Sequence, residues 1–265
     1  MDLKTNIYTN VDRAINEFRS GRPIIVKNGV ENWVFFTVEN LNIKILNQLT
    51  KGSEKKIFTY ITNNKANNLN IKKKNYKGCF SFPFRIKDTK LLMSMHTKKL
   101  NKFEKNKFDK NYYNKCPNFI NYIMNLAKNA KTIPCLIGSL IDPKLVSHSV
   151  MVFDYRNLKN QNKIITQSTK MVSKSNIPLV KNHKAIIMVF KSFVGGLEHI
   201  VLQIGKPNKQ KSINLRIQSA CLTGEVFHSI KCDCNEQLHQ SINYISKNGG
   251  GYIIHLEQEG RGIGL

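Results

Sequence analysis

Apolar residues recur at helical spacing near the start of the chain. The pattern predicts a helix that follows Asn10 as its N-cap and ends at Gly21. The apolar face of this helix consists of Val11, Ala14, Ile15 and Phe18. Residues at these spacings lie on one side of a helix, so we expect this side to face a core.

Short apolar runs alternate with further helical segments through the first 167 residues. The runs predict strands at 24–26, 33–38, 56–62 and 133–141, and helical spacing predicts helices at 39–49 and 118–130. Between about 63 and 115, Lys, Asn and Tyr dominate, and we expect loops with short elements there. Strands that alternate with helices are typical of the α/β fold class.

The composition changes at 168–184, which is polar and contains one proline. We interpret this stretch as a linker between an N-terminal α/β domain, residues 1–167, and a second domain, residues 185–265. A chain of 265 residues is long enough for two domains of ordinary size.

The second domain has the clearer pattern. Apolar runs at 185–193 and 198–205 flank a glycine-bearing turn and predict a β-hairpin. A half-buried strand is predicted at 213–219, a helix at 236–251 and a strand at 252–258. The apolar positions of that half-buried strand and of the helix are Ile213, Leu215, Ile217, Leu238, Ile242 and Ile245.

The net charge of +25 makes nucleic acid, an anionic membrane or a phosphorylated molecule a plausible partner. Lysines, however, accompany asparagines and isoleucines along the whole chain, which disfavours a selected nucleic-acid surface. No apolar run is long enough to span a bilayer, and "MDLKTNIYTN" lacks the basic start and apolar stretch of a secretory signal. We therefore expect a cytoplasmic protein.

Three of the six cysteines fall within "CLTGEVFHSIKCDC", at Cys221, Cys232 and Cys234. In a reducing compartment, clustered cysteines indicate metal ligands or reactive thiols rather than disulfides. Three thiolates leave a fourth position open, as a catalytic zinc requires. The alternative is a cluster formed by chance or by packing. The remaining cysteines, Cys79, Cys116 and Cys135, are scattered like ordinary buried residues.

Polar groups surround the cluster. Arg216 and Ser219 precede it, Gln237 follows it, and the terminal "QEGRGIG" places Glu259 and Arg261 among glycines. Backbone amides and an arginine suit phosphate oxygens. An ion pair at a glycine-rich turn is the alternative interpretation of the terminal motif.

"LRIQSACLTGEVFHSIKCDCNEQL" followed by "GGGYIIHLEQEGRGIGL" closely resembles GTP cyclohydrolase II, the first committed enzyme of riboflavin synthesis. The hairpin "HKAIIMVFKSFVGGLEHIVLQIGKP" is also similar to the opening of that family. The resemblance covers roughly the last third of the chain. It implies a mixed-sheet domain, of which 185–265 would be the N-terminal part.

The resemblance also implies an activity and a site. The family opens the imidazole ring of GTP and releases formate and pyrophosphate. One Zn²⁺ would bind Cys221, Cys232 and Cys234, its water would attack C8 of the guanine, and Mg²⁺ would assist at the triphosphate. The implied partners are GTP and a second copy in a homodimer. The implied GTP-binding residues are Arg216, Ile217, Gln218, Ser219, Ala220, Gln237, Glu259, Gly260 and Arg261.

The chain departs from the family pattern in several places. Gln218 stands where the family usually has His, Glu225 replaces Asp, and Asn235 replaces a Gly. Because asparagine tolerates left-handed backbone better than most residues, we expect the turn at Asn235 to persist. The family continues beyond Leu265, where its general-base Asp and nucleophilic Arg lie, so no catalytic residue is assigned. We expect this chain to bind zinc with little turnover, and robust formate release would contradict that expectation.

A fainter similarity links "VDRAINEFRSGRPIIV" to the opening of dihydroxybutanone phosphate synthase, but no dense acidic loop follows to bind Mg²⁺. We therefore interpret 1–167 as a degenerate, non-catalytic domain in a long form of the cyclohydrolase. Two alternatives from other classes remain open: a non-catalytic remnant that binds zinc or GTP, and a basic nucleic-acid-binding protein.

Overall fold

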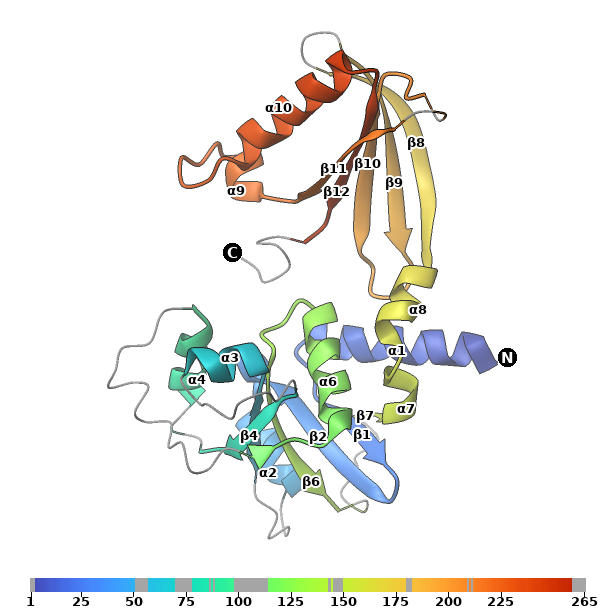
Figure 1. Ribbon diagram of the computed structural model, residues 1–265. Coiled ribbons are helices and arrows are strands. Elements are labelled where there is room, and N and C mark those ends of the chain that lie inside the picture. The colour runs from blue at the N-terminus through green and yellow to red at the C-terminus, as the bar shows by residue number, and fades with distance from the viewer. Residues whose placement is uncertain are drawn as a thin grey trace. The chain divides into compact units, whose positions relative to one another are not determined.

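The computed structural model describes residues 3–50, 57–69, 78–85, 87, 89–97, 114–142, 144, 150–179, 183–208, 210 and 212–258. The chain divides into two compact units, an N-terminal unit (Met1–Asn162) and a C-terminal unit (Lys163–Leu265). Each unit contains its own mixed β-sheet with accompanying helices (Figure 1). The predicted α/β fold class is confirmed. Within the described residues, no helix has the length and apolar character needed to cross a membrane.

The N-terminal unit alternates short strands and helices. Its elements are α1 (Leu3–Arg19), β1 (Ile24–Asn28), β2 (Glu31–Thr37), a 3-10 turn η1 (Val38–Asn40), α2 (Ile43–Thr50), β3 (Phe58–Ile61), α3 (Asn63–Asn68), β4 (Phe80–Pro83), α4 (Thr89–Thr97), β5 (Asn114–Lys115), α6 (Asn118–Asn129), β6 (Cys135–Ile141), β7 (Met151–Asp154) and α7 (Tyr155–Leu158). The next helix, α8 (Gln161–Gln167), contains the boundary between the two units. The described strands form a sheet in the order β5-β4-β3-β6-β2-β1-β7. Only β1 and β7 pair in parallel among these neighbours.

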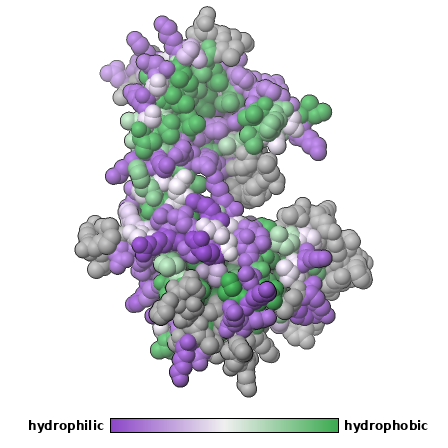
Figure 2. All heavy atoms as spheres, turned by 180° about the vertical axis from the view of Figure 1, so that it is seen from behind, coloured by the Kyte–Doolittle hydropathy of each residue, from purple (hydrophilic) through white to green (hydrophobic). Residues whose placement is uncertain are grey.

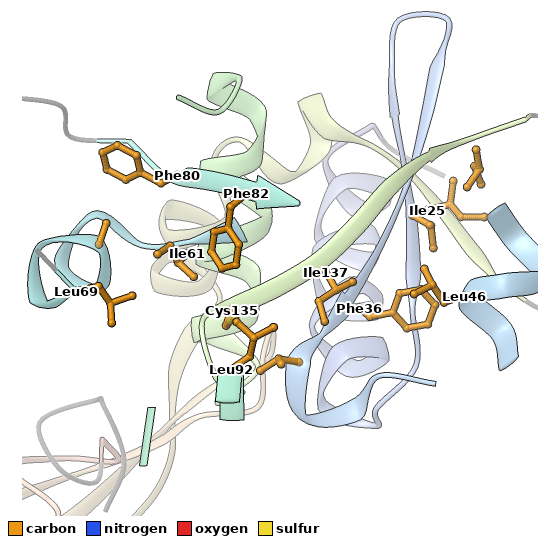
Figure 3. Packing of buried hydrophobic residues seen from close by; sticks show 14 residues of the cluster. Ile25, Phe36, Leu46, Ile61, Leu69, Phe80, Phe82, Leu92, Cys135 and Ile137 are labelled. Carbon is orange, nitrogen blue, oxygen red and sulfur yellow. The ribbon is translucent and has the colours of Figure 1, made fainter. Parts of the chain in front are cut away.

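This sheet is buried on both faces, which explains its continuous apolar runs. Successive residues of β2 point to opposite faces. Phe36 packs with Leu46 of α2 and Ile137 of β6 in one core cluster (Figure 3). Trp33 and Phe35 meet Phe119 of α6 on the other face, with ring centroids 5.7 and 6.5 Å away. Helices on both sides of the sheet therefore shield it from water.

The first helix is largely as the sequence predicts. Its four apolar positions from Val11 to Phe18 are fully buried, and Gly21 follows its end with φ +74°. A positive φ suits glycine, because it has no Cβ. The predicted N-cap is wrong: Asn10 lies inside α1, because the helix begins at Leu3, seven residues before Asn10.

The short elements predicted between 63 and 115 are α3, β4, α4 and β5, and residues 70–77 and 98–113 lie outside the described residues.

The C-terminal unit is a sheet with one long helix against it. Its elements after α8 are β8 (Thr169–Leu179), β9 (His183–Ser192), β10 (Glu198–Ile204), β11 (Asn214–Ser219), α9 (Leu222–Glu225), α10 (Cys234–Lys247) and β12 (Gly251–Leu256). The described strands lie in the order β11-β12-β10-β9-β8, and only β11 and β12 pair in parallel. The predicted hairpin is the β9–β10 pair. The core contains Ile245 and, packed beside it, Leu238 and Ile242 of α10, as the periodicity predicts.

The predicted linker at 168–184 is wrong over most of its length. Residues 169–179 form strand β8, which pairs with β9 in antiparallel register. In the described sheet β8 is an edge strand, and its residues 170–176 are exposed. An edge strand is held by backbone hydrogen bonds, so it can carry exposed lysines and Pro178. Its composition therefore resembles that of a linker.

The predicted burial of β11 is also wrong. Leu215 and Ile217 are 57% and 60% exposed, whereas Gln218 is only 4% exposed. β11 is an edge strand of the described sheet, and its polar side chains face the side on which α10 packs. Its apolar side chains point to the opposite face. In the space-filling view, hydrophobic residues gather over the C-terminal unit (Figure 2).

Candidate metal centre

The three clustered cysteines come together at the ends of two helices. Cys221 is the N-cap of α9, Cys234 is the first residue of α10, and Cys232 lies in the loop between them. Their sulfur atoms all lie within 4.8 Å of one another. This is the one group of potential metal ligands found among the described residues. Cysteines that are separated along the chain therefore lie close together in the structure.

The spacing of the sulfur atoms suits a tetrahedral metal ion. With zinc–sulfur bonds of about 2.3 Å, two sulfurs of one tetrahedral site lie about 3.8 Å apart. Cys221 Sγ and Cys232 Sγ are 3.7 Å apart. Soft thiolates are ligands that zinc prefers, so the residues fit a zinc ion held by three sulfurs.

Gly224 makes the close approach of the thiols possible. A Cβ at this position would lie 2.7 Å from Cys232 Sγ, 3.1 Å from Cys234 Cβ and 3.3 Å from Cys221 Sγ. The first of these distances is shorter than real Cβ contacts show. The cluster therefore closes around a residue that lacks a side chain.

The thiols of the cluster differ in acidity. The Thr223 hydroxyl, 3.5 Å from Cys221 Sγ, and the Gly224 N–H hold the pKa of Cys221 below its usual value. The hydrogen bond to the Cys221 sulfur and partial burial raise the pKa of Cys234 to about 12. In the metal-free cluster, Cys221 thus becomes a thiolate at a lower pH than Cys234 does. Binding of a metal ion must then displace the proton that Cys234 retains.

The cysteines of the N-terminal unit are of a different kind. Burial raises the pKa of Cys79 to about 11 and that of Cys116 to about 12, and it also raises the pKa of the fully buried Cys135. Their burial confirms the interpretation of these three as ordinary core residues.

This contrast predicts two classes of thiol reactivity. In the metal-free protein at neutral pH, we expect iodoacetamide to modify Cys221 at least about tenfold faster than Cys79 or Cys135, because the thiolate is the reactive form. As the pH is lowered, the modification rate of Cys221 should persist to a lower pH than the rates of Cys79 and Cys135, because its pKa is depressed. Mass spectrometry of timed digests measures each rate, and bound zinc should protect Cys221. Equal rates at Cys221 and Cys135 would contradict the described acidity and burial.

A polar network adjoins the cluster. Arg216 donates from Nε and Nη2 to Gln218 Oε1, at 3.3 and 3.1 Å, and from Nη2 to Gln237 Oε1 at 2.6 Å. Gln218 Nε2 donates to Glu225 Oε1 at 3.1 Å and to the Cys234 carbonyl at 3.4 Å. The structure thus brings three of the predicted GTP-binding residues together beside the cysteines.

The other predicted GTP-binding residues lie apart from this network or outside the described residues. Ile217 points to the opposite face of the sheet and is exposed. The Ser219 hydroxyl accepts a hydrogen bond from Gln258 Nε2 at 3.0 Å, and the Ala220 N–H donates to the Leu256 carbonyl at 2.9 Å. Glu259, Gly260 and Arg261 lie outside the described residues. The GTP-binding role of all nine residues stays a prediction.

Three further residues complete the surroundings of the cluster. His255 Nε2 lies 2.8 Å from Glu225 Oε2, Asn235 Nδ2 donates to the Glu225 carbonyl at 3.2 Å, and Gln237 Nε2 donates to Asp233 Oδ2 at 2.8 Å. The left-handed turn expected at Asn235 is wrong, because Asn235 lies within α10. The positive φ in this loop belongs to His228, at +51°. No sequence motif marks His255, since a single histidine in a strand carries no pattern.

A surface hollow with a volume of about 620 Å³ borders the cluster. It is lined by Gly224, Cys232, Asn235 and the loop from His228 to Asp233. One of the three candidate ligands therefore faces a solvent-accessible space, as an open coordination position requires.

Comparisons with known proteins found one matching family model and several similar proteins. A family model described as GTP cyclohydrolase II matches residues 169–265. The GTP cyclohydrolase-2 of Azospirillum brasilense is 29% identical over 150 residues, which cover 54% of this chain and 39% of that protein. That of Aliivibrio fischeri is 46% identical over 93 residues, which cover 35% of this chain and 43% of that protein.

The riboflavin biosynthesis protein RibBA of Staphylococcus haemolyticus is 42% identical over 119 residues, or 44% of this chain and 29% of that protein. The chain thus spans less than half the length of each of these relatives. A solved structure of a two-domain 3,4-dihydroxy-2-butanone 4-phosphate synthase from A. baumannii aligns over 93% of this chain and 81% of its own, at 8% identity and a TM-score of 0.41. That likeness is too weak to carry a statement about fold or function. Residues 169–265 of this chain are thus similar to the GTP cyclohydrolase II family.

Proposed function

We propose that the C-terminal unit carries the zinc centre and part of the GTP site of a GTP cyclohydrolase II. The proposed reaction opens the imidazole ring of GTP, releases formate and pyrophosphate, and begins riboflavin biosynthesis. One observation carries the proposal: three cysteine sulfurs lie within 4.8 Å of one another inside the region that matches the family.

The zinc would be held by Cys221, Cys232 and Cys234. When bound, it would supply Lewis-acid chemistry that lowers the pKa of a water molecule for attack on C8 of guanine. Three thiolates and one Zn²⁺ would leave one negative charge in excess, and the Arg216 guanidinium adjoins the cluster through Gln218. Arg216 and Gln237, which hydrogen-bond to each other, would orient the purine nucleotide, and Mg²⁺ would accompany the GTP phosphates.

The homodimer that the resemblance implies is also a proposal. Leu215 and Ile217 on β11, and Phe227 and Ile230 in the loop after α9, are exposed apolar residues of the same unit. Exposed apolar side chains on one face of a strand, such as Leu215 and Ile217, are typical of protein–protein contacts, and they support an association of copies through this unit.

Zinc-dependent GTP binding tests the proposed function. We expect calorimetry with Mg²⁺ and GTP to show binding to the zinc-loaded chain that weakens by at least about tenfold, about 1.4 kcal/mol, when a chelator removes the zinc. A measurement of formate release then distinguishes between two possible functions. Zinc-dependent formate release identifies a working cyclohydrolase, and GTP binding without formate identifies a non-catalytic zinc- and GTP-binding protein. Absence of both zinc and GTP binding would contradict the proposal.

A further inference from the structure

Gln218 is almost completely buried, yet it is surrounded by polar groups. We infer that Gln218, Glu225 and His255 form a positioning network that holds two of the three cysteines, Cys221 and Cys234, in their metal-binding arrangement. Gln218 then acts on the metal centre through its neighbours instead of contacting a nucleotide with its side chain. This inference rests on the proposed zinc site.

The hydrogen-bonding capacity of the Gln218 amide is fully used within the protein. A glutamine side chain offers two N–H donors and an oxygen that accepts two hydrogen bonds. Here Nε2 donates to the Glu225 carboxylate and to the Cys234 carbonyl, and Oε1 accepts both bonds from Arg216. Only this orientation of the amide is possible, because the guanidinium has only donors and the carboxylate and carbonyl have only acceptors.

Glu225 connects the helices that carry the cysteines to the sheet. One carboxylate oxygen accepts from Gln218 of β11, and the other lies 2.8 Å from His255 Nε2 of β12. The backbone carbonyl of Glu225 accepts from Asn235 of α10, and its N–H donates to the Cys221 carbonyl at 2.7 Å. The Glu225 side chain is 14% exposed, so water competes little for these bonds.

These contacts fix two of the three ligands, Cys221 and Cys234, relative to each other. Cys221 is the N-cap of α9, which is held through Glu225, and Cys234 begins α10, whose first carbonyl accepts from Gln218. Residues that orient metal ligands typically change metal affinity by about 10- to 100-fold when they are replaced. We expect an effect of this size from breaking the contact between Gln218 and Glu225.

The substitution Gln218→Glu distinguishes a positioning role of Gln218 from a purely electrostatic effect of charge on metal affinity. Glutamate has nearly the same shape, but it places an acceptor against the Glu225 carboxylate and the Cys234 carbonyl. The added negative charge alone would attract a cation and tighten binding. A disrupted network would instead weaken binding, by about 10- to 100-fold. The two explanations therefore predict opposite signs.

Cobalt(II) titrations of the full chain measure both affinity and geometry. We expect one Co²⁺ per wild-type chain with visible absorption of a tetrahedral thiolate site, and weaker binding with an altered spectrum for Gln218→Glu. The matched control is Gln203→Glu on β10, where the glutamine donates to the Gly205 carbonyl at 3.3 Å. This control should bind as the wild type does.

A second variant restores the pairing. In Gln218→Glu with Glu225→Gln, the new amide at 225 can donate to the new carboxylate at 218, and the net charge equals that of the wild type. We expect this pair to recover at least part of the lost affinity and the wild-type spectrum. Should Gln218→Glu fail to fold, Gln218→Met keeps the length of the side chain, removes its hydrogen bonds and carries the same test.

The outcomes are distinguishable. If the wild-type chain binds no Co²⁺ or Zn²⁺, the zinc proposal and the positioning network both fail. If the wild type binds and Gln218→Glu binds as tightly or more tightly with an unchanged spectrum, the positioning network is overturned while the zinc site stands.

Discussion

Replacement of Cys232 by serine is expected to lower the zinc affinity of the chain by more than about a hundredfold. Structural zinc sites in small domains bind with about 10 kcal/mol or more. If three thiolates share this free energy evenly, the loss of one costs about 3 kcal/mol, which exceeds a hundredfold change in the dissociation constant. A serine hydroxyl is a poor substitute, because it stays protonated at neutral pH. Competition with a chromophoric chelator measures the change.

The matched control for this substitution is Cys135→Ser. Cys135 is fully buried in β6 of the N-terminal unit and lies in the apolar core cluster around Ile137. We expect this variant to keep the wild-type zinc stoichiometry while its unfolding midpoint falls, because a hydroxyl replaces an apolar group in a core. Equal zinc loss in both variants would indicate unfolding, and unchanged zinc affinity in Cys232→Ser would remove Cys232 from the site.

Gly224→Ala is expected to abolish stoichiometric zinc binding although it leaves every ligand in place. The added methyl group would lie 2.7 Å from Cys232 Sγ, so that thiol must move away from the other two sulfurs. Gly224 lies in α9, and it is not among the residues with positive φ. Helix propensity alone would therefore favour alanine by up to about 1 kcal/mol. Zinc content and the thermal midpoint of the metal-free chain measure the two effects separately.

Gly249→Ala is expected to behave in the opposite way. A Cβ there would meet no atom within 4 Å, but Gly249 has φ +82°, which costs an L-residue roughly 1–2 kcal/mol. This variant should lose stability and keep its zinc. If Gly224→Ala binds zinc as the wild type does, the cluster is not as closely packed around Gly224 as the structure indicates.

Hydrophobic periodicity correctly predicted the elements that bury one continuous apolar face. α1, α6 and α10 each bury an apolar stripe against a sheet, and the β9–β10 hairpin has glycines in its turn, so the sequence pattern and the structure agree there. The same reasoning failed at β8 and β11. Both are edge strands of the described sheet, where backbone pairing rather than side-chain burial defines the strand.

The candidate site was predictable only in part. The density of cysteines in residues 221–234 indicated metal ligands or reactive thiols, and the fold brings their sulfur atoms within 4.8 Å of one another. The role of Gln218 was not predictable, since it depends on Glu225 and Cys234, which the fold brings to it from seven and sixteen residues away. His255 comes from a different strand, thirty residues from its partner Glu225. Such long-range pairs leave no trace in local sequence patterns.

X-ray absorption at the zinc edge of the purified, zinc-loaded chain tests the central claim most directly. The account predicts three sulfur neighbours at about 2.3 Å and one oxygen or nitrogen neighbour at about 2.0–2.2 Å. That result corresponds to Cys221, Cys232 and Cys234 with one position left for another ligand. A shell of four sulfurs, or one without sulfur, would contradict a zinc centre held by these three cysteines.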